Sequence, residues 1–167
     1  MLSEIVETLT FFVKASYEAM LTNPGPFFTE KDYPDLTGQK WLVTGATGGI
    51  GLDVSKLLLG QDAEVWLVGR SQTKLDSAIK TLQQQFPLGK IRYIIIDYTD
   101  LRSVKPAVEQ LRGEVDHLNG IIHNAGVMFV PKGSVTKQGY EETIGVNNLA
   151  TSLLQDLLDP LIENVPN

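Results

Sequence analysis

Four short apolar runs, separated by segments with helical periodicity, limit the folds open to this chain. They are KWLVT (40–44), AEVWLV (63–68), IRYIII (91–96) and LNGIIH (118–123). Strands that alternate with helices along a chain form a parallel sheet. Because the runs are almost continuously apolar, we expect helices to cover both faces of that sheet. Right-handed crossovers then predict an α/β fold with a doubly wound sheet and the strand order 3-2-1-4.

The composition supports one compact domain over residues 39–167. The 167-residue chain is 43% hydrophobic and 20% charged, which is typical of a globular protein. Its net charge is -6 and it has no run of Lys or Arg, so we exclude nucleic acid as a partner. The absence of cysteine excludes disulfides, thiol nucleophiles and thiolate metal sites. We predict no metal site, and a cytoplasmic location fits the lack of cysteine.

Residues 1–38 form a separate N-terminal segment. Over residues 1–22, apolar side chains recur at three- and four-residue steps, which predicts an amphipathic helix. Its four charged residues argue against a membrane span, and the lack of a basic start argues against a signal peptide. The helix docks on the protein's own body, on a partner, or peripherally on a membrane, although its acidic polar face disfavours lipid. An extended linker then runs to Gly38.

The segment TGATGGIG (44–51) joins the first predicted strand to the helix that follows it. Glycines at this junction let the backbone approach a pyrophosphate, and the helix start offers free N–H groups and a positive dipole end. No Gly-Lys-Ser/Thr closes the segment, so it is not a P-loop. A tight turn without a ligand would also use glycines here. Strand, glycine turn and helix together predict a Rossmann-type dinucleotide site.

Arg70 and Lys74 follow the second predicted strand, about twenty residues after the glycine turn. In a dinucleotide fold an acidic residue here binds the ribose 2′-hydroxyl, whereas an arginine can pair with a 2′-phosphate. These two cations therefore favour NADP(H) over NAD(H). The alternative is a solvated arginine at the start of the next helix.

Five segments resemble, in order and spacing, the short-chain dehydrogenase/reductase family: TGATGGIG (44–51), GRSQTK (69–74), DYTDL (97–101), HNAGVM (123–128) and GYEETIGVNNLA (139–150). The resemblance is strongest to fungal members similar to retinol dehydrogenases, which share FFTEKDYPDLTG (27–38) and PKGSVTKQGYE (131–141). It extends from Phe27 to about Ile162. Gly48 also fits the epimerase-like branch of the family, but the NAG at 124–126 and the GYE at 139–141 do not.

The resemblance implies a role for each candidate site residue. Gly45, Gly49, Ile50 and Gly51 would bind the pyrophosphate, Arg70 and Lys74 the 2′-phosphate, Asp97 and Tyr98 the adenine, and Asn124 and Gly126 the adenosine side of the cofactor. Asn147 matches the family's Asn that holds a water in the catalytic proton relay. The implied cofactor is NADP(H).

The residues themselves leave alternatives open at these positions. Asp97 accepts a hydrogen bond from a ligand amino group or caps the next helix. The Asn124 amide bonds a ligand or ties neighbouring strands together. Asn147 is either a relay residue or a polar residue beside the apolar stripe of the last helix. His123 replaces the family's usual Asn, and we expect it to be partly buried with a hydrogen-bond partner.

The resemblance also implies hydride transfer between the nicotinamide and a carbonyl or alcohol carbon of a small molecule. In that family a Tyr, with a Lys four residues further on and a Ser nearby, handles the proton. The five tyrosines here, Tyr17, Tyr33, Tyr93, Tyr98 and Tyr140, have no Lys at that spacing. The chain ends at Asn167, before the expected place of these residues, and we expect it to be inactive alone.

Two hypotheses for the function follow. The chain is the front part of an NADP(H)-dependent oxidoreductase, or it is a complete nucleotide-binding or interaction module without turnover. A Tyr-x-x-x-Lys encoded downstream of codon 167 would favour the first. The fourth strand, with no fifth beside it, and the wide apolar stripe of the last helix (146–161) further predict a homo-oligomer, a partner or aggregation.

Overall fold

The computed structural model describes residues 32–163 and residue 165. The chain divides into two compact units, Met1–Tyr33 and Pro34–Asn167, and the fold below is that of the second. The amphipathic helix over residues 1–22 and the first part of the linker lie outside the described residues, so they stay predictions. None of the described helices is long and apolar enough to cross a membrane.

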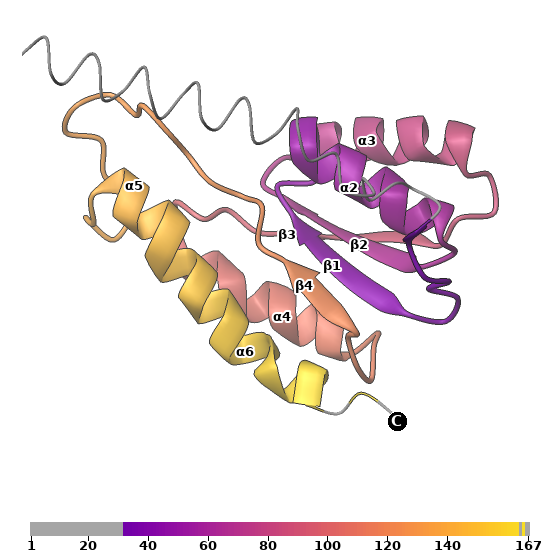
Figure 1. Ribbon diagram of the computed structural model, residues 1–167. Helices are drawn as coiled ribbons and strands as arrows, with labels where there is room; N and C mark the ends of the chain where they lie inside the picture. Colours follow the sequence, from indigo (N-terminus) through magenta and orange to yellow (C-terminus); the bar gives the residue numbers. More distant parts are fainter. Residues whose placement is uncertain (1–31, 164, 166–167) are drawn as a thin grey trace, which may run out of the picture. The chain divides into compact units, whose positions relative to one another are not determined.

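Four parallel strands form one sheet: β1 (Lys40–Thr44), β2 (Glu64–Gly69), β3 (Ile91–Ile95) and β4 (Gly120–Ile122). Their order is β3-β2-β1-β4, which confirms the predicted doubly wound α/β fold of the Rossmann type (Figure 1). β1 lies inside the sheet, with Thr44 opposite Val68 of β2 and Val43 opposite Ile122 of β4. The glycine turn after Thr44 therefore leaves the sheet between the ends of β2 and β4.

Helices cover both faces of the sheet, as the apolar strands predicted (Figure 1). One face carries α2 (Gly49–Gly60) and α3 (Gln72–Gln85), and the other carries α4 (Val104–Arg112) and α6 (Thr151–Glu163). Short helices lead into two of these elements. The 3-10 helix η2 (Leu101–Ser103) precedes α4, and α5 (Glu142–Ile144) with the π-helix η3 (Gly145–Ala150) precedes α6.

Alternate strand residues build a separate core on each face of the sheet. Leu42, Trp66 and Ile94 belong to the core beneath α4 and α6, whereas Val43 and Leu67 belong to the core beneath α2 and α3. Each of these five side chains is at most 1% exposed. Burial on both faces explains why the strand sequences are continuously apolar.

The apolar stripe of η3 and α6 lies in two rows. One row is buried in the core shared with α4, and it consists of Val146, Ala150, Leu154, Leu158 and Leu161. The second row, Leu153 and Leu157, is only partly buried. The end of α6 is tied to the segment before β4, because the Leu118 N–H donates to the Leu161 carbonyl at 2.9 Å.

Candidate functional site

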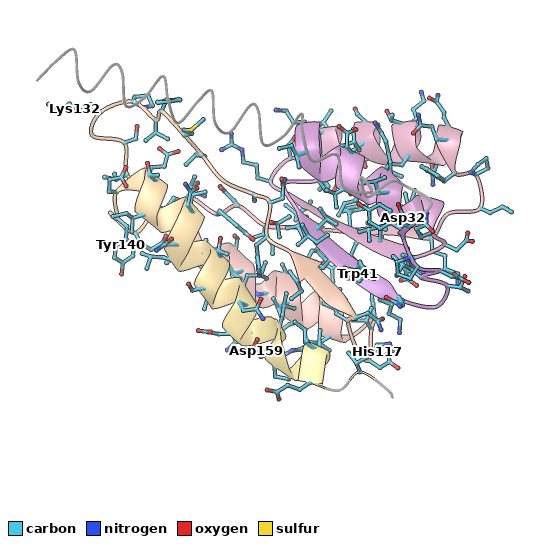
Figure 2. The ribbon with its side chains drawn as sticks, viewed as in Figure 1. Asp32, Trp41, His117, Lys132, Tyr140 and Asp159 are labelled. Carbon is cyan, nitrogen blue, oxygen red and sulfur yellow. The ribbon has the colours of Figure 1, made fainter. Side chains whose placement is uncertain are left out.

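A pocket of about 210 Å³ opens where the carboxyl ends of the strands meet the segments that follow them. It is lined by Gly45, Thr47, Val68, Gly69, Arg70, Ile96, Asp97, Tyr98, Thr99, Ala125, Gly126, Val127 and Val146. In open α/β sheets, ligands bind at this position, where neighbouring connections leave in opposite directions. Figure 2 places Lys132 and Tyr140, from the segment after β4, at the opposite end of the sheet from His117, which precedes β4.

Some of the predicted site residues line the pocket, and others do not. Gly45, Arg70, Asp97, Tyr98 and Gly126 line it. The predicted residues outside its lining are Gly49, Ile50, Gly51, Lys74, Asn124 and Asn147. The first three form the start of α2, Lys74 lies in the first turn of α3, and the two asparagines hold backbone groups of the lining.

Two glycines of the turn are required by close packing. Gly45 has a φ of +66°, and a Cβ there would lie 2.9 Å from the Cα of Ala125. A Cβ on Gly51 would lie 2.5 Å from the Gly45 carbonyl oxygen and 2.6 Å from Asn124 Nδ2. These distances are shorter than any van der Waals contact, so only glycine lets α2 approach the ends of β1 and β4 this closely.

The start of α2, in contrast, is open. Gly48 provides no side-chain cap, and the first turn contains no acidic residue. Apart from neighbouring backbone, no atom of the described residues lies within 4 Å of an ideal Cβ on Gly49, and Ile50 is 75% exposed. The first N–H groups of the helix and the positive end of its dipole are therefore available to an anion.

Arg70 and Lys74 lie after β2, the strand next to β1 in the sheet. Arg70 directly follows β2 and lines the pocket, and Lys74 lies in the first turn of α3. The Ser71 hydroxyl caps α3 by accepting from the Lys74 N–H at 3.4 Å, which fixes where that helix begins. Both cationic side chains are exposed, and neither forms an ion pair within the described part of the chain.

Asp97, at the end of β3, folds back on its own turn. One carboxylate oxygen accepts from the Thr99 N–H at 3.0 Å and from the Thr99 hydroxyl at 2.7 Å. Asp97 does not cap the next helix, because Asp100 occupies that position and accepts from the Arg102 N–H at 3.2 Å. The adenine contact implied for Asp97 stays a prediction. The Thr99 bonds do not use its second oxygen, Oδ2, which lies 3.8 Å from Lys137 Nζ.

Tyr98 contributes little surface to the pocket. The side chain is 7% exposed and belongs to the core beneath α4 and α6. Its hydroxyl lies near Thr44 but forms no hydrogen bond of standard geometry within the described residues. Burial raises the pKa of Tyr98 to about 12, so the phenol stays neutral. Any adenine contact through Tyr98 would have to use the ring or the backbone, since the hydroxyl is buried.

Asn124 ties the ends of two neighbouring strands together. Its Nδ2 donates to the Thr44 carbonyl at 3.1 Å and to the Gly45 carbonyl at 3.4 Å. Its backbone N–H donates to the Thr44 hydroxyl at 3.0 Å, and the Ala125 N–H donates to the same oxygen at 2.9 Å. The structure thus shows the tie between strands, and the cofactor contact implied for Asn124 stays a prediction. Thr44, fully buried, had no sequence signal that marked it for this role.

The expectation that His123 is partly buried is wrong, because its side chain is exposed. The expected hydrogen-bond partner is present: Nε2 lies 2.7 Å from Gln155 Oε1 on α6. β4 pairs only with β1 in the described sheet, so a side chain that follows β4 has no neighbouring strand to cover it.

The side-chain amide of Asn147 forms two hydrogen bonds with the backbone of Val127. Oδ1 accepts from the Val127 N–H at 2.8 Å, and Nδ2 donates to the Val127 carbonyl at 2.9 Å. An added Cβ on Gly126 would lie 3.2 Å from Asn147 Oδ1, so a glycine suits this close approach. The side chain stands on the π-helix η3, an irregularity that is frequent at functional sites. It holds the pocket wall at Val127, and its implied role in a proton relay stays a prediction.

The sheet order and the glycine turn between β1 and α2 define a Rossmann-type fold. A family model described as short chain dehydrogenase matches residues 39–164. A short-chain dehydrogenase/reductase of Phomopsis amygdali is 36% identical over 141 residues, covering 83% of this chain and 42% of the relative. One from Emericella nidulans is 37% identical over 139 residues, covering 82% of this chain and 45% of the relative.

A solved short chain dehydrogenase of Escherichia coli CFT073, complexed with NADPH, superposes on this fold with a TM-score of 0.66. It is 26% identical and covers 76% of this chain and 55% of the bacterial one. The chain belongs to the short-chain dehydrogenase/reductase family. It spans less than half the length of the two fungal relatives.

Proposed function

We propose that this chain binds NADP(H) and forms the cofactor-binding portion of an oxidoreductase that transfers hydride between nicotinamide and a small-molecule carbonyl or alcohol. The observation that carries the cofactor choice is Arg70, an exposed guanidinium at the pocket without an ion-pair partner among the described residues. A guanidinium there suits the bidentate recognition of a ribose 2′-phosphate. Family membership and the NADPH complex of the bacterial relative support the proposal.

The side chains present fit such a cofactor. The uncapped start of α2, at Gly49 and Ile50, would hold the pyrophosphate, with Gly51 letting the helix approach the turn. Arg70 and Lys74 would hold the 2′-phosphate. The adenosine side would lie against the wall formed by Asp97, Tyr98 and Gly126, behind which Asn124 fixes the glycine turn. The nicotinamide itself would supply or accept the hydride.

The cofactor preference is tested by titrating NADPH and NADH against the wild-type chain and Arg70→Ala. Removing a charge-assisted contact to the 2′-phosphate costs about 1.5–3 kcal/mol, so NADPH should bind about 10- to 150-fold more weakly to the variant. The affinity for NADH should hardly change. Arg92→Ala, an exposed arginine on β3 outside the pocket lining, is the matched control. Equal affinities of the wild type for the two nucleotides would contradict the assignment.

A second candidate function is a nucleotide-binding module without turnover. The observation in its favour is that none of the five tyrosines has a lysine four residues further on. Under this alternative the chain binds NADPH yet does not oxidise it with any aldehyde or ketone, and the reading frame downstream of codon 167 encodes no Tyr-x-x-x-Lys. We also propose a cytoplasmic location, with peripheral membrane contact through residues 1–22 as the alternative.

A further inference from the structure

A small hairpin between β4 and α5, residues 134–141, is well fixed internally. Val135 and Glu141 form an antiparallel bridge, and the Thr136 N–H donates to the Tyr140 carbonyl at 2.8 Å. Gly139 turns the chain with a φ of +84°. Thr136 is 3% exposed, so the hairpin has a buried side chain of its own. These contacts give the connection between β4 and α5 a defined conformation.

Two consecutive residues of this hairpin clamp the turn that follows β3. The Lys137 N–H donates to the Thr99 carbonyl at 2.8 Å. Gln138 Oε1 accepts from the Leu101 N–H at 3.1 Å, and its Nε2 donates to Asp100 Oδ1 at 2.7 Å. The hairpin therefore forms hydrogen bonds with two backbone groups and one carboxylate of a segment about 38 residues earlier in the chain.

Charge reinforces the clamp. Lys137 Nζ lies 3.3 Å from Asp100 Oδ2 and 3.8 Å from Asp97 Oδ2. The Asp100 side chain is only 14% exposed, and it is also bound by Arg102. Hydrogen bonds from Arg102, then from Gln138, hold the pKa of the Asp100 carboxyl well below its usual range, so it stays ionised.

The other side of the hairpin rests on the helix that carries Asn147. A Cβ on Gly145 of η3 would collide with the Thr136 side chain, so hairpin and helix are in intimate contact. Glu141 closes the hairpin and caps α5, since its carboxylate accepts from the Ile144 N–H at 2.9 Å. Asn147 then holds Val127, which lines the pocket as Asp97 does. The hairpin thus contacts the supports of two parts of the pocket lining.

We propose that Lys137 and Gln138 are positioning residues for the adenosine side of the cofactor. They fix the pocket wall at residues 97–99, and that wall would contact the adenosine. This inference rests on the proposed NADP(H) site. Asp97 and Thr99 line the pocket, and Lys137 contacts the Thr99 carbonyl and the Asp97 carboxylate. Neither Lys137 nor Gln138 lines the pocket, so their effect on binding passes through the turn.

The test measures the affinity of the full 167-residue chain for NADPH and for adenosine 2′,5′-bisphosphate, which lacks the nicotinamide half. Gln138→Ala should weaken both ligands by the same factor, roughly 3- to 30-fold, because the loss arises on the adenosine side. Lys137→Met should act in the same direction, and it keeps the inference testable if Gln138→Ala does not fold. Lys132→Met, an exposed lysine of the same connection, is the matched control and should change neither affinity.

Amide hydrogen exchange of the ligand-free protein supplies a second readout. Gln138→Ala should speed exchange of the Leu101 amide, whose acceptor it removes, while β1 keeps its protection. A loss of affinity for NADPH without a loss for adenosine 2′,5′-bisphosphate would overturn the inference, as would wild-type affinities in both variants. If the wild-type chain bound neither ligand, the proposed cofactor site would fall and this inference with it.

Discussion

At Gly51 the backbone of α2 lies so close to the glycine turn that one methyl group has no space. We expect Gly51→Ala to lower the free energy of unfolding by about 1–3 kcal/mol, because the added Cβ meets the Gly45 carbonyl oxygen and the Asn124 amide. Urea denaturation followed by circular dichroism measures this change.

Gly60→Ala, in the same helix, is the control for this prediction. The nearest atom to an added Cβ there is Cε1 of Phe86 at 3.8 Å, an ordinary contact. Since alanine also favours helix over glycine, we expect no destabilisation. Equal losses of stability in the two variants would show that α2 is sensitive to glycine replacement in general and not to packing at Gly51.

Single residues show where sequence reasoning reaches its limit. The positions of Gly45 and Arg70 at the pocket were predictable, because the ends of the first two strands have fixed places in this fold. The partner of Asn124 was not, because the sequence does not say whether an amide faces a ligand or the carbonyls of β1. His123 was placed wrongly since its exposure depends on which strands lie beside β4, a property of the whole sheet.

At the scale of elements, β1 and the segment before β4 are joined at their amino ends. The Lys40 N–H donates to Asn119 Oδ1 at 2.8 Å, and Lys40 Nζ lies 2.6 Å from Asp116 Oδ1. A hydrogen bond from Lys40 lowers the pKa of the Asp116 carboxyl to about 2. His117 stands beside the same carboxylate, with Nδ1 at 2.9 Å.

This depressed pKa predicts the direction of an acid effect. A carboxyl whose pKa is lowered in the folded state stabilises the fold above its unfolded pKa, and that contribution disappears as the pH falls through the folded value. Between pH 4 and about 2 we therefore expect Asp116→Asn to lose less stability than the wild type. The difference should be small, because Asp116 is exposed and the pair is screened. Thermal unfolding at half-unit pH steps measures it, with the exposed Asp156→Asn as control.

Elements with local signals were predictable, and elements fixed by distant contacts were not. All four strands follow from their apolar runs, and their order follows from the handedness of crossovers. The 134–141 hairpin has no comparable sequence pattern. It is held by long-range contacts such as the hydrogen bond from Gln138 to Asp100, 38 residues away. The π-helix η3 likewise continues the apolar periodicity of α6, so nothing in the stripe marks where its hydrogen bonding changes.

For the whole molecule, we expect the isolated chain to self-associate, to need a partner, or to aggregate. In the described sheet β4 pairs only with β1, and its second edge offers backbone groups to another chain. The partly buried row of Leu153 and Leu157 on α6 adds apolar surface. Sedimentation velocity at several concentrations tests this prediction. A compact monomer with cooperative two-state unfolding would contradict it.

The bond between Asn124 and Thr44, 80 residues apart in the chain, has a consequence for biosynthesis. Every strand pair here is parallel, so each needs a long crossover before its first contact forms. Such a high contact order slows folding, because loop-closure entropy is lost before the contacts offset it. On the ribosome, the glycine turn emerges early but has no opposite wall until β4 and the hairpin after it have been translated. The proposed nucleotide site therefore exists only in a nascent chain whose residues up to 141 have been translated.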